Sequence, residues 1–118
     1  MTDCVFCDIV AGTSPADIIL DWPSILIFTP LNPVVEGHVL VIPKKHVADF
    51  TEDPVESGFT MVAAAEYARD FDMPMNLITS RGREATQSVF HLHLHLVPRA
   101  KDDGLALPWY SGKGNHND

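Results

Sequence analysis

The pattern of hydrophobic and polar positions predicts five short strands and one helix. Runs rich in branched apolar residues, which favour strands, occupy residues 16–21, 24–29, 38–43, 75–80 and 88–98. The first two runs lie on either side of a short Asp-Trp-Pro break, so we expect them to form a hairpin. Three strands, a helix and two more strands, joined mostly by short connections, are typical of an α+β fold with an antiparallel sheet. We therefore predict an α+β fold with about five antiparallel strands and one main helix.

The helix is expected within residues 52–71. Asp53 is placed to cap its first turn, Pro54 suits the first helical position, and Glu56 completes a capping box. The helix should end before Pro74, because the residue preceding a proline disfavours helical geometry. Five apolar residues recur at helical spacing and form the expected stripe: Met61, Ala64, Ala65, Ala68 and Phe71.

Three histidines alternate with leucines in the last predicted strand. His91, His93 and His95 should share one face of that strand, since side chains two residues apart point the same way. The residues between them are apolar and should face the core, which leaves the histidines on a functional or solvent-facing side. Such a row can bind a metal, attack a substrate or simply be solvated. The outer two histidines of a straight strand lie about 13 Å apart, so the three can be divided between a metal and another role.

Length and composition limit the function classes. A chain of 118 residues, 46% of them hydrophobic, fits one domain over residues 1–118, with a polar tail from about residue 111 to 118 that we expect to be frayed. No apolar run reaches the length of a membrane span, and the N-terminus lacks the basic region of a signal peptide, so we expect a cytoplasmic protein. A net charge of -8 argues against long nucleic acid as a partner, although it does not exclude a small phosphorylated ligand.

Cys4 and Cys7 form a C-x-x-C pair at the start of the chain. A structural disulfide is not expected in a reducing compartment. A thioredoxin-like redox motif would lie near a βαβ pattern, whereas this pair precedes every predicted strand. We interpret the pair as half of a metal site, which needs two further ligands.

Two segments together resemble the histidine-triad (HIT) nucleotide-binding family. These are GHVLVIPKKHV at residues 37–47 and QSVFHLHLHLVPR at residues 87–99. The N-terminal CVFCDIVAG, residues 4–12, is similar to the start of the zinc-containing bacterial members. The matches follow one another in order over residues 4–99, and the two longer motifs are highly specific as a pair, whereas C-x-x-C alone is not.

The resemblance implies a nucleotidyl hydrolase or transferase that forms a nucleotidyl-histidine intermediate at the α-phosphate. By this match His93 is the nucleophile, while His38 and His95 bind the phosphate. His95 is also a candidate for proton transfer to the leaving group. Further candidates for nucleotide and phosphate binding are Gln87, Ser88, Gly82, Ser80 and Asn32.

The resemblance also supplies the missing metal ligands. It assigns His46 and His91, with the two cysteines, to a closed Cys2His2 zinc site, which is structural rather than catalytic because it has no open position. The alternative is that Cys4 and Cys7 are free thiols and that His91 only orients His93.

The sequence departs from the family pattern around the nucleoside and the phosphate loop. Pro30 stands where many members have an acidic residue that binds the ribose hydroxyls, and Asn32 is a candidate substitute. Ser80-Arg81-Gly82 replaces the usual Asn-x-Gly, and Arg81 or Arg83 could favour a more highly charged leaving group. A nucleotide-binding or signalling module without catalysis therefore stays an alternative, as does a zinc-stabilised interaction domain.

Family members are typically homodimers, so the resemblance implies a homodimer here. The LPWY segment at residues 107–110 resembles a C-terminal segment whose tryptophan reaches the partner's active site in some members. The alternative for Trp109 is that it packs the tail on its own domain.

Overall fold

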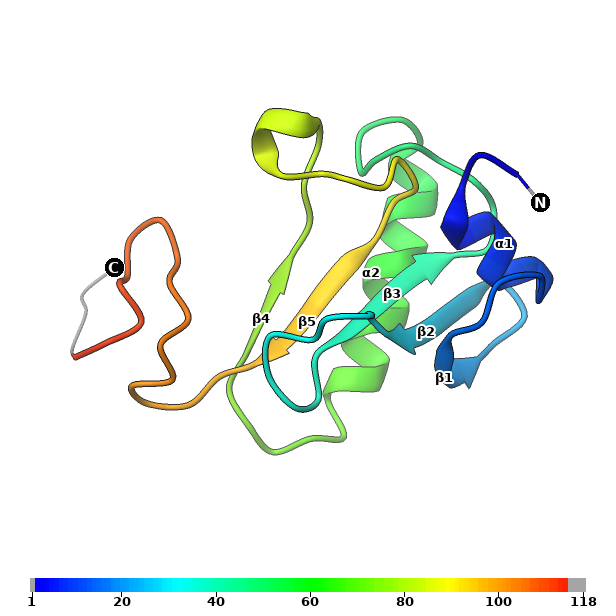
Figure 1. Ribbon diagram of the computed structural model, residues 1–118. Helices are drawn as coiled ribbons and strands as arrows, with labels where there is room; N and C mark the ends of the chain where they lie inside the picture. Colours follow the sequence, from blue (N-terminus) through cyan, green and yellow to red (C-terminus); the bar gives the residue numbers. More distant parts are fainter. Residues whose placement is uncertain (1, 115–118) are drawn as a thin grey trace.

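A five-stranded antiparallel sheet organises the computed structural model, which describes residues 2–114 (Figure 1). The sheet order is β1-β2-β3-β5-β4, and each neighbouring pair is antiparallel. This confirms the predicted α+β class, the five strands and the β1–β2 hairpin. The strands are β1 (Asp17–Asp21), β2 (Ile25–Thr29), β3 (Val39–Pro43), β4 (Met75–Ile78) and β5 (Leu94–Pro98).

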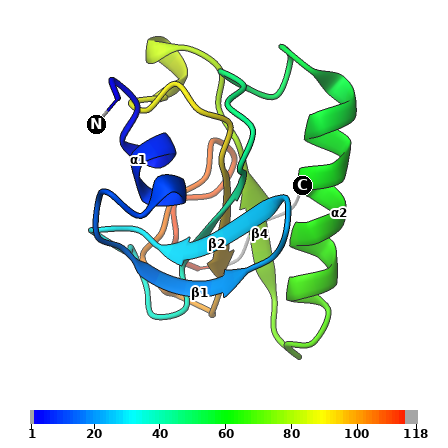
Figure 2. The same ribbon diagram turned by 90° about the vertical axis from the view of Figure 1, so that its right-hand side faces the viewer.

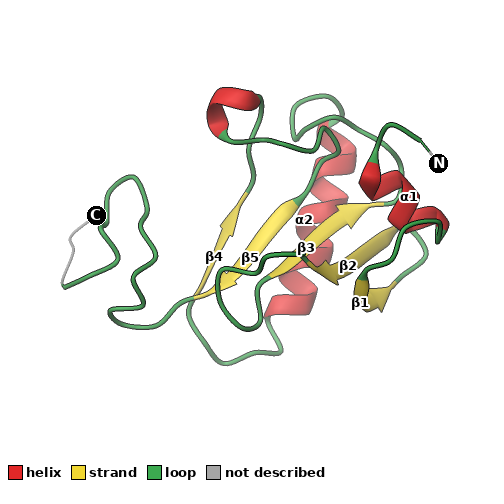
Figure 3. Ribbon diagram, viewed as in Figure 1, coloured by secondary structure: helices red, strands yellow, loops and turns green. Residues whose placement is uncertain are grey.

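The sheet has a helix on each face, so both sides of the central strands β2 and β3 are buried (Figure 2). Helix α2 (Pro54–Ala68) packs on the face that carries Ile27 and Val41. Helix α1 (Val5–Ala11) packs on the other face through Phe6, which joins Leu40 and Ile42. The alternation of residues 38–43 predicts this division, with Leu40 and Ile42 on one side of the strand and Val39 and Val41 on the other, whereas α1 was not predicted. Figure 3 shows that the remaining segments are mostly loops and turns, apart from the short 3-10 helix η1 (Arg83–Ala85).

The start of α2 agrees with its capping signals, but the predicted apolar stripe is correct only for Ala64 and Ala68. Asp53 caps the helix by accepting a hydrogen bond from the Glu56 amide, with Pro54 in the first turn. The side that faces the sheet is instead formed by Thr60, Ala63 and Ala64, with Tyr67 and Ala68 partly buried beside them. A hydrophobicity pattern overlooks Thr60, whose hydroxyl donates to the Glu56 carbonyl at 2.8 Å and can therefore be buried. Of the predicted stripe, Met61, Ala65 and Phe71 are exposed.

The last strand begins at Leu94, six residues later than predicted, and the histidine side is not a solvent face. Leu92, Leu94 and Leu96 are buried as expected, but Phe90 is exposed. His91 is fully buried, because α1 covers the side of the sheet on which the histidines lie. The predicted alternatives for this side were a functional or a solvent-facing one, and the burial excludes the second. The sequence pattern gave no sign that α1 covers it.

The chain after β5 forms a turn that is held by the side chain of Arg99. Its guanidinium donates to the Asp103 carboxylate at 2.8 and 3.0 Å and to the Asn76 side-chain oxygen. Trp109 is exposed, so it does not pack the tail on its own domain. Of the predicted polar tail, residues 111–114 belong to this turn, and residues 115–118 lie outside the described residues. Between residues 2 and 114, no helix combines the length and the hydrophobicity needed to cross a membrane.

Candidate functional site

The structure brings His38, His93 and His95 together on the α1 side of the sheet. His38 lies just before β3, and His95 of β5 pairs with Leu40 of β3, so the two histidines are neighbours across the sheet. The His38 Nε2 and His95 Nδ1 atoms are 3.0 Å apart. The His93 and His95 rings lie 5.1 Å apart between centroids, and the Phe6 ring meets His93 edge-on at 5.2 Å.

Hydrogen-bond partners fix where His38 and His95 carry their protons. The Val34 amide donates to His38 Nδ1 at 3.1 Å, so this nitrogen is an acceptor and the proton of a neutral ring lies on Nε2. His38 Nε2–H then donates to His95 Nδ1, which leaves the His95 proton on Nε2. Burial lowers the pKa of His95 to about 4, and it also lowers the pKa of His38. Both rings are therefore neutral near pH 7, and His95 keeps one N–H to donate to a ligand.

His93 has the opposite arrangement, with its second nitrogen unprotonated. Its Nδ1 lies 2.8 Å from the backbone oxygen of His91, and since a carbonyl oxygen only accepts, Nδ1 must donate. The lone pair of the neutral ring is then on Nε2. Burial lowers the pKa of His93, which favours this neutral form. A neutral imidazole with a free Nε2 can act as a nucleophile at neutral pH.

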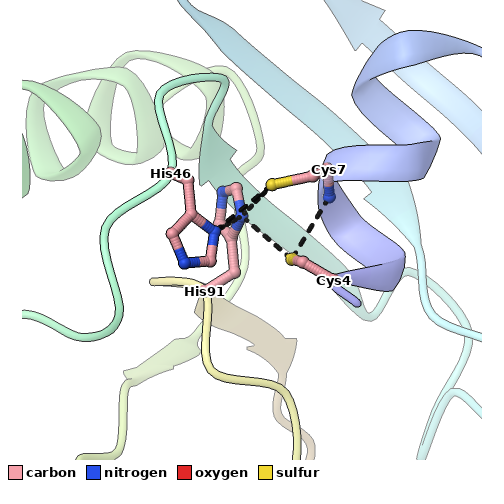
Figure 4. A group of neighbouring side chains, drawn as sticks. All are labelled: Cys4, Cys7, His46 and His91. Carbon is pink, nitrogen blue, oxygen red and sulfur yellow. Dashed lines mark hydrogen bonds between the residues drawn. The ribbon is translucent and has the colours of Figure 1, made fainter. Parts of the chain in front are cut away.

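The four predicted metal ligands, Cys4, Cys7, His46 and His91, form a cluster (Figure 4). Cys4 and Cys7 come from the start of α1, His46 from the loop after β3, and His91 from the segment before β5. Their ligand atoms all lie within 4.8 Å of one another. The two histidine Nδ1 atoms are 3.3 Å apart, and three sulfur–nitrogen distances, from Cys4 to His91 and from Cys7 to His46 and His91, are 3.2 to 3.5 Å.

These separations fit a tetrahedral zinc ion. Ideal zinc–nitrogen and zinc–sulfur bonds place two nitrogens about 3.3 Å apart and a nitrogen and a sulfur about 3.6 Å apart. His91 also has the correct tautomer, because its Nε2 donates to the Pro43 carbonyl at 2.7 Å and leaves the Nδ1 lone pair facing the cysteines. Burial raises the pKa of the Cys7 thiol to about 11, which argues against a reactive free thiolate in the absence of a metal. The cluster and its donor chemistry therefore fit zinc.

Gln87 is buried and holds three segments of the backbone together. Its Nε2 donates to the carbonyls of Ala48 and Val89 at 2.7 and 3.2 Å, and its Oε1 accepts from the Gly82 amide at 2.8 Å. These contacts use both donors of the amide within the protein. They favour a structural role for Gln87, which connects backbone segments. Direct binding of phosphate by Gln87 stays a prediction.

The other predicted ligand-binding residues differ in their exposure. Ser88 and Asn32 are exposed, and Ser80 is half-buried. Gly82 has a φ of 91°, a conformation that side chains rarely adopt, so glycine is required there by the backbone itself.

Three contributors to the site could not be recognised from the sequence. Phe6 packs against His93, the Val34 amide sets the His38 tautomer, and the Thr79 hydroxyl donates to the His93 carbonyl at 2.8 Å. Nothing in the sequence distinguishes Phe6 from Val5, the other apolar residue between the two cysteines. Nothing local to Val34 or Thr79 indicates a partner far along the chain.

Comparison with known proteins agrees with this geometry. A family model described as "HIT domain" matches residues 11–102. "Protein hit" of Bacillus subtilis is 37% identical over 114 residues, covering 91% of this chain and 79% of the relative. "Adenosine 5'-monophosphoramidase hnt1" of Schizosaccharomyces pombe is 33% identical over 111 residues, covering 92% and 84%. A zinc-bound histidine triad family protein from Mycobacterium smegmatis superposes with a TM-score of 0.77 at 39% identity, covering 88% of this chain and 80% of that one.

Proposed function

Because this chain belongs to the histidine-triad family, a family with hydrolase members, we propose that it cleaves nucleotide derivatives at the α-phosphate. The proposed substrates are nucleoside phosphoramidates or dinucleoside polyphosphates, and the proposed activity is that of a nucleotidyl hydrolase or transferase. The observation that carries the proposal is the unprotonated Nε2 of His93, whose ring lies 5.1 Å between centroids from the ring of His95, which carries its proton on Nε2.

In the proposed reaction His93 Nε2 attacks the α-phosphorus and forms a phosphorus–nitrogen bond. The bond from phosphorus to the leaving group breaks, and the leaving group departs with the electron pair and takes up a proton. His95 donates a hydrogen bond to the phosphate through Nε2–H and is the candidate for carrying that proton. A water oxygen then attacks phosphorus, the phosphorus–nitrogen bond to His93 breaks, a proton of the water returns to His95, and a nucleoside monophosphate is released. His38 acts by keeping the proton of His95 on Nε2.

We propose further that Cys4, Cys7, His46 and His91 bind one structural zinc ion. The protein supplies all four ligands, so a bound zinc ion would have no open coordination position. Its contribution would be to hold the surrounding segments rigidly. The proposed nucleotide contacts are Ser88, Ser80, Gly82 and Asn32. The backbone at Gly82 can approach a phosphate closely because it carries no side chain.

The proposal is tested by incubating the purified protein with adenosine phosphoramidate and, separately, with a diadenosine polyphosphate. We expect release of AMP, which chromatography would detect. Binding of AMP by calorimetry without any release from either substrate would favour a non-catalytic nucleotide-binding module instead. No affinity for AMP at all would favour a zinc-stabilised interaction domain.

We also propose a homodimer formed through β4 and the outer side of α2. β4 is an edge of the described sheet, where Leu77 and Ile78 are exposed. Val55, Phe59 and Val62 form an apolar row on α2, with Phe59 61% exposed. An unpaired strand edge next to exposed apolar side chains is a typical site of self-association.

Replacing Phe59 with glutamate is therefore expected to convert the dimer to a monomer, because two carboxylates would be buried in a symmetric interface. Light scattering coupled to size exclusion would measure the mass. Ile18→Glu on β1, at the opposite edge of the sheet, is the matched control and should stay dimeric. A Phe59→Glu protein with the same mass as the wild type would contradict this interface.

A further inference from the structure

The segment that carries the nucleophile lies outside the sheet ladder. Strand β3 pairs with β5 only as far as Val41 and Leu94, and β4 pairs with β5 only as far as Ile78 and His95. Residues 87–93 therefore receive no register partner from either neighbouring strand. Their backbone must be fixed by other contacts if His93 is to have a defined position.

Side chains hold three alternate carbonyl groups of this segment. The Val89 carbonyl accepts from Gln87 Nε2 at 3.2 Å, the His91 carbonyl from His93 Nδ1 at 2.8 Å, and the His93 carbonyl from Thr79 Oγ1 at 2.8 Å. Together with the backbone bond from the Leu92 amide to the Val47 carbonyl at 2.7 Å, these bonds take the place of a strand ladder. Thr79 is the member that comes from outside the segment and acts on the peptide of the nucleophile itself.

We infer that Thr79 is a positioning residue for His93, an inference that rests on the proposed function for its catalytic consequence. The hydroxyl fixes the plane of the peptide group between His93 and Leu94. The orientation of this peptide group sets the direction in which the His93 side chain projects from the backbone. Thr79 directly follows β4, so it connects the end of that strand to the nucleophile. Nucleophilic attack is sensitive to displacement, and an error of about 1 Å can reduce the rate roughly 100-fold.

Thr60 provides a matched control. Its hydroxyl also donates to a backbone carbonyl at 2.8 Å, but within α2, and the residue is fully buried. Replacing either threonine with valine removes the same kind of bond and keeps a similar shape. A general effect of losing such a bond should therefore appear in both variants.

The experiment compares Thr79→Val, Thr79→Ser and Thr60→Val in the full chain, with adenosine phosphoramidate as substrate. We expect Thr79→Val to lower kcat by roughly 10- to 100-fold with KM within about twofold. Thr79→Ser, which keeps the hydroxyl, should recover kcat to within about threefold of the wild type. Thr60→Val should keep the kcat of the wild type. Unchanged kcat in Thr79→Val, an equal loss in Thr60→Val, or no recovery in Thr79→Ser would each overturn the inference.

A second measurement separates this inference from the proposed activity. Nitrogen-15 NMR can follow the exchange with water of the His93 Nδ1 proton, which is bonded to the His91 carbonyl. Thr79→Val should speed this exchange by about tenfold relative to Thr60→Val, because the segment is held less firmly. If the wild type releases no AMP but the exchange responds in this way, the proposed function fails and the positioning role stands. Unchanged exchange overturns the positioning role whatever the activity.

Discussion

His93→Ala is expected to lower the rate of AMP release by at least about 1,000-fold while AMP still binds. The substitution removes the nitrogen that would form the covalent bond to phosphorus, and no neighbouring ring can replace it. His95 Nδ1 accepts a hydrogen bond from His38 Nε2–H, and the Nε2 of His95 is protonated. Neither nitrogen of His95 therefore offers a free lone pair. AMP affinity should change by less than about tenfold, because the other phosphate-binding groups are retained.

Single-turnover kinetics with adenosine phosphoramidate and calorimetry with AMP would measure the two effects. His95→Ala is the comparison, since it removes a hydrogen-bond donor rather than the proposed nucleophile. It should lower the rate of AMP release roughly 100- to 1,000-fold. Acid-quenched wild-type protein should carry a nucleotidyl group on a peptide that contains His93, and the His93→Ala protein should carry none. Turnover by His93→Ala at a rate close to that of the wild type would exclude the mechanism.

The sequence predicted what depends on local chemistry and regular alternation. The hairpin, the two-sided pattern of β3 and the capping of α2 by Asp53 follow from residues next to one another. The clustering of Cys4, Cys7, His46 and His91 was implied by resemblance, since their separation along the chain carries no geometric information by itself.

What the sequence could not predict depends on contacts between distant residues. The start of β5 is set by where β3 and β4 stop pairing with it, and the leucine–histidine alternation continues unchanged across that point. The buried face of α2 includes Thr60, whose burial depends on a hydrogen bond that a hydrophobicity pattern does not contain. The tautomers of His38 and His95 depend on the Val34 amide, which only the folded loop brings close.

Removal of the proposed zinc ion is the second change for which we expect a large effect. Cys7→Ser, or treatment of the wild type with a strong zinc chelator, should lower the melting temperature by roughly 10 °C or more. The cluster joins α1, the loop after β3 and the segment before β5, so its loss frees three parts of the structure at once. A groove of about 570 Å3 lined by residues that include Cys7 and His46 gives a chelator access to the site. Calorimetry and elemental analysis for zinc would measure stability and occupancy.

The same experiment distinguishes two possible roles of the proposed zinc ion, which are to stabilise the fold and to hold His93 in position. His91 links the metal cluster to His93. Its ring faces the cysteines, and its carbonyl accepts a hydrogen bond from His93 Nδ1–H. If the metal supports the nucleophile, its removal should also speed exchange of the His93 Nδ1 proton at temperatures where the protein stays folded. The chelator should have no further effect on Cys7→Ser, which serves as the control. A wild-type melting temperature that does not respond to the chelator, with no zinc in the protein, would favour free thiols at Cys4 and Cys7. The position of His91 would then depend on its bond to the Pro43 carbonyl and on the packing of Phe6.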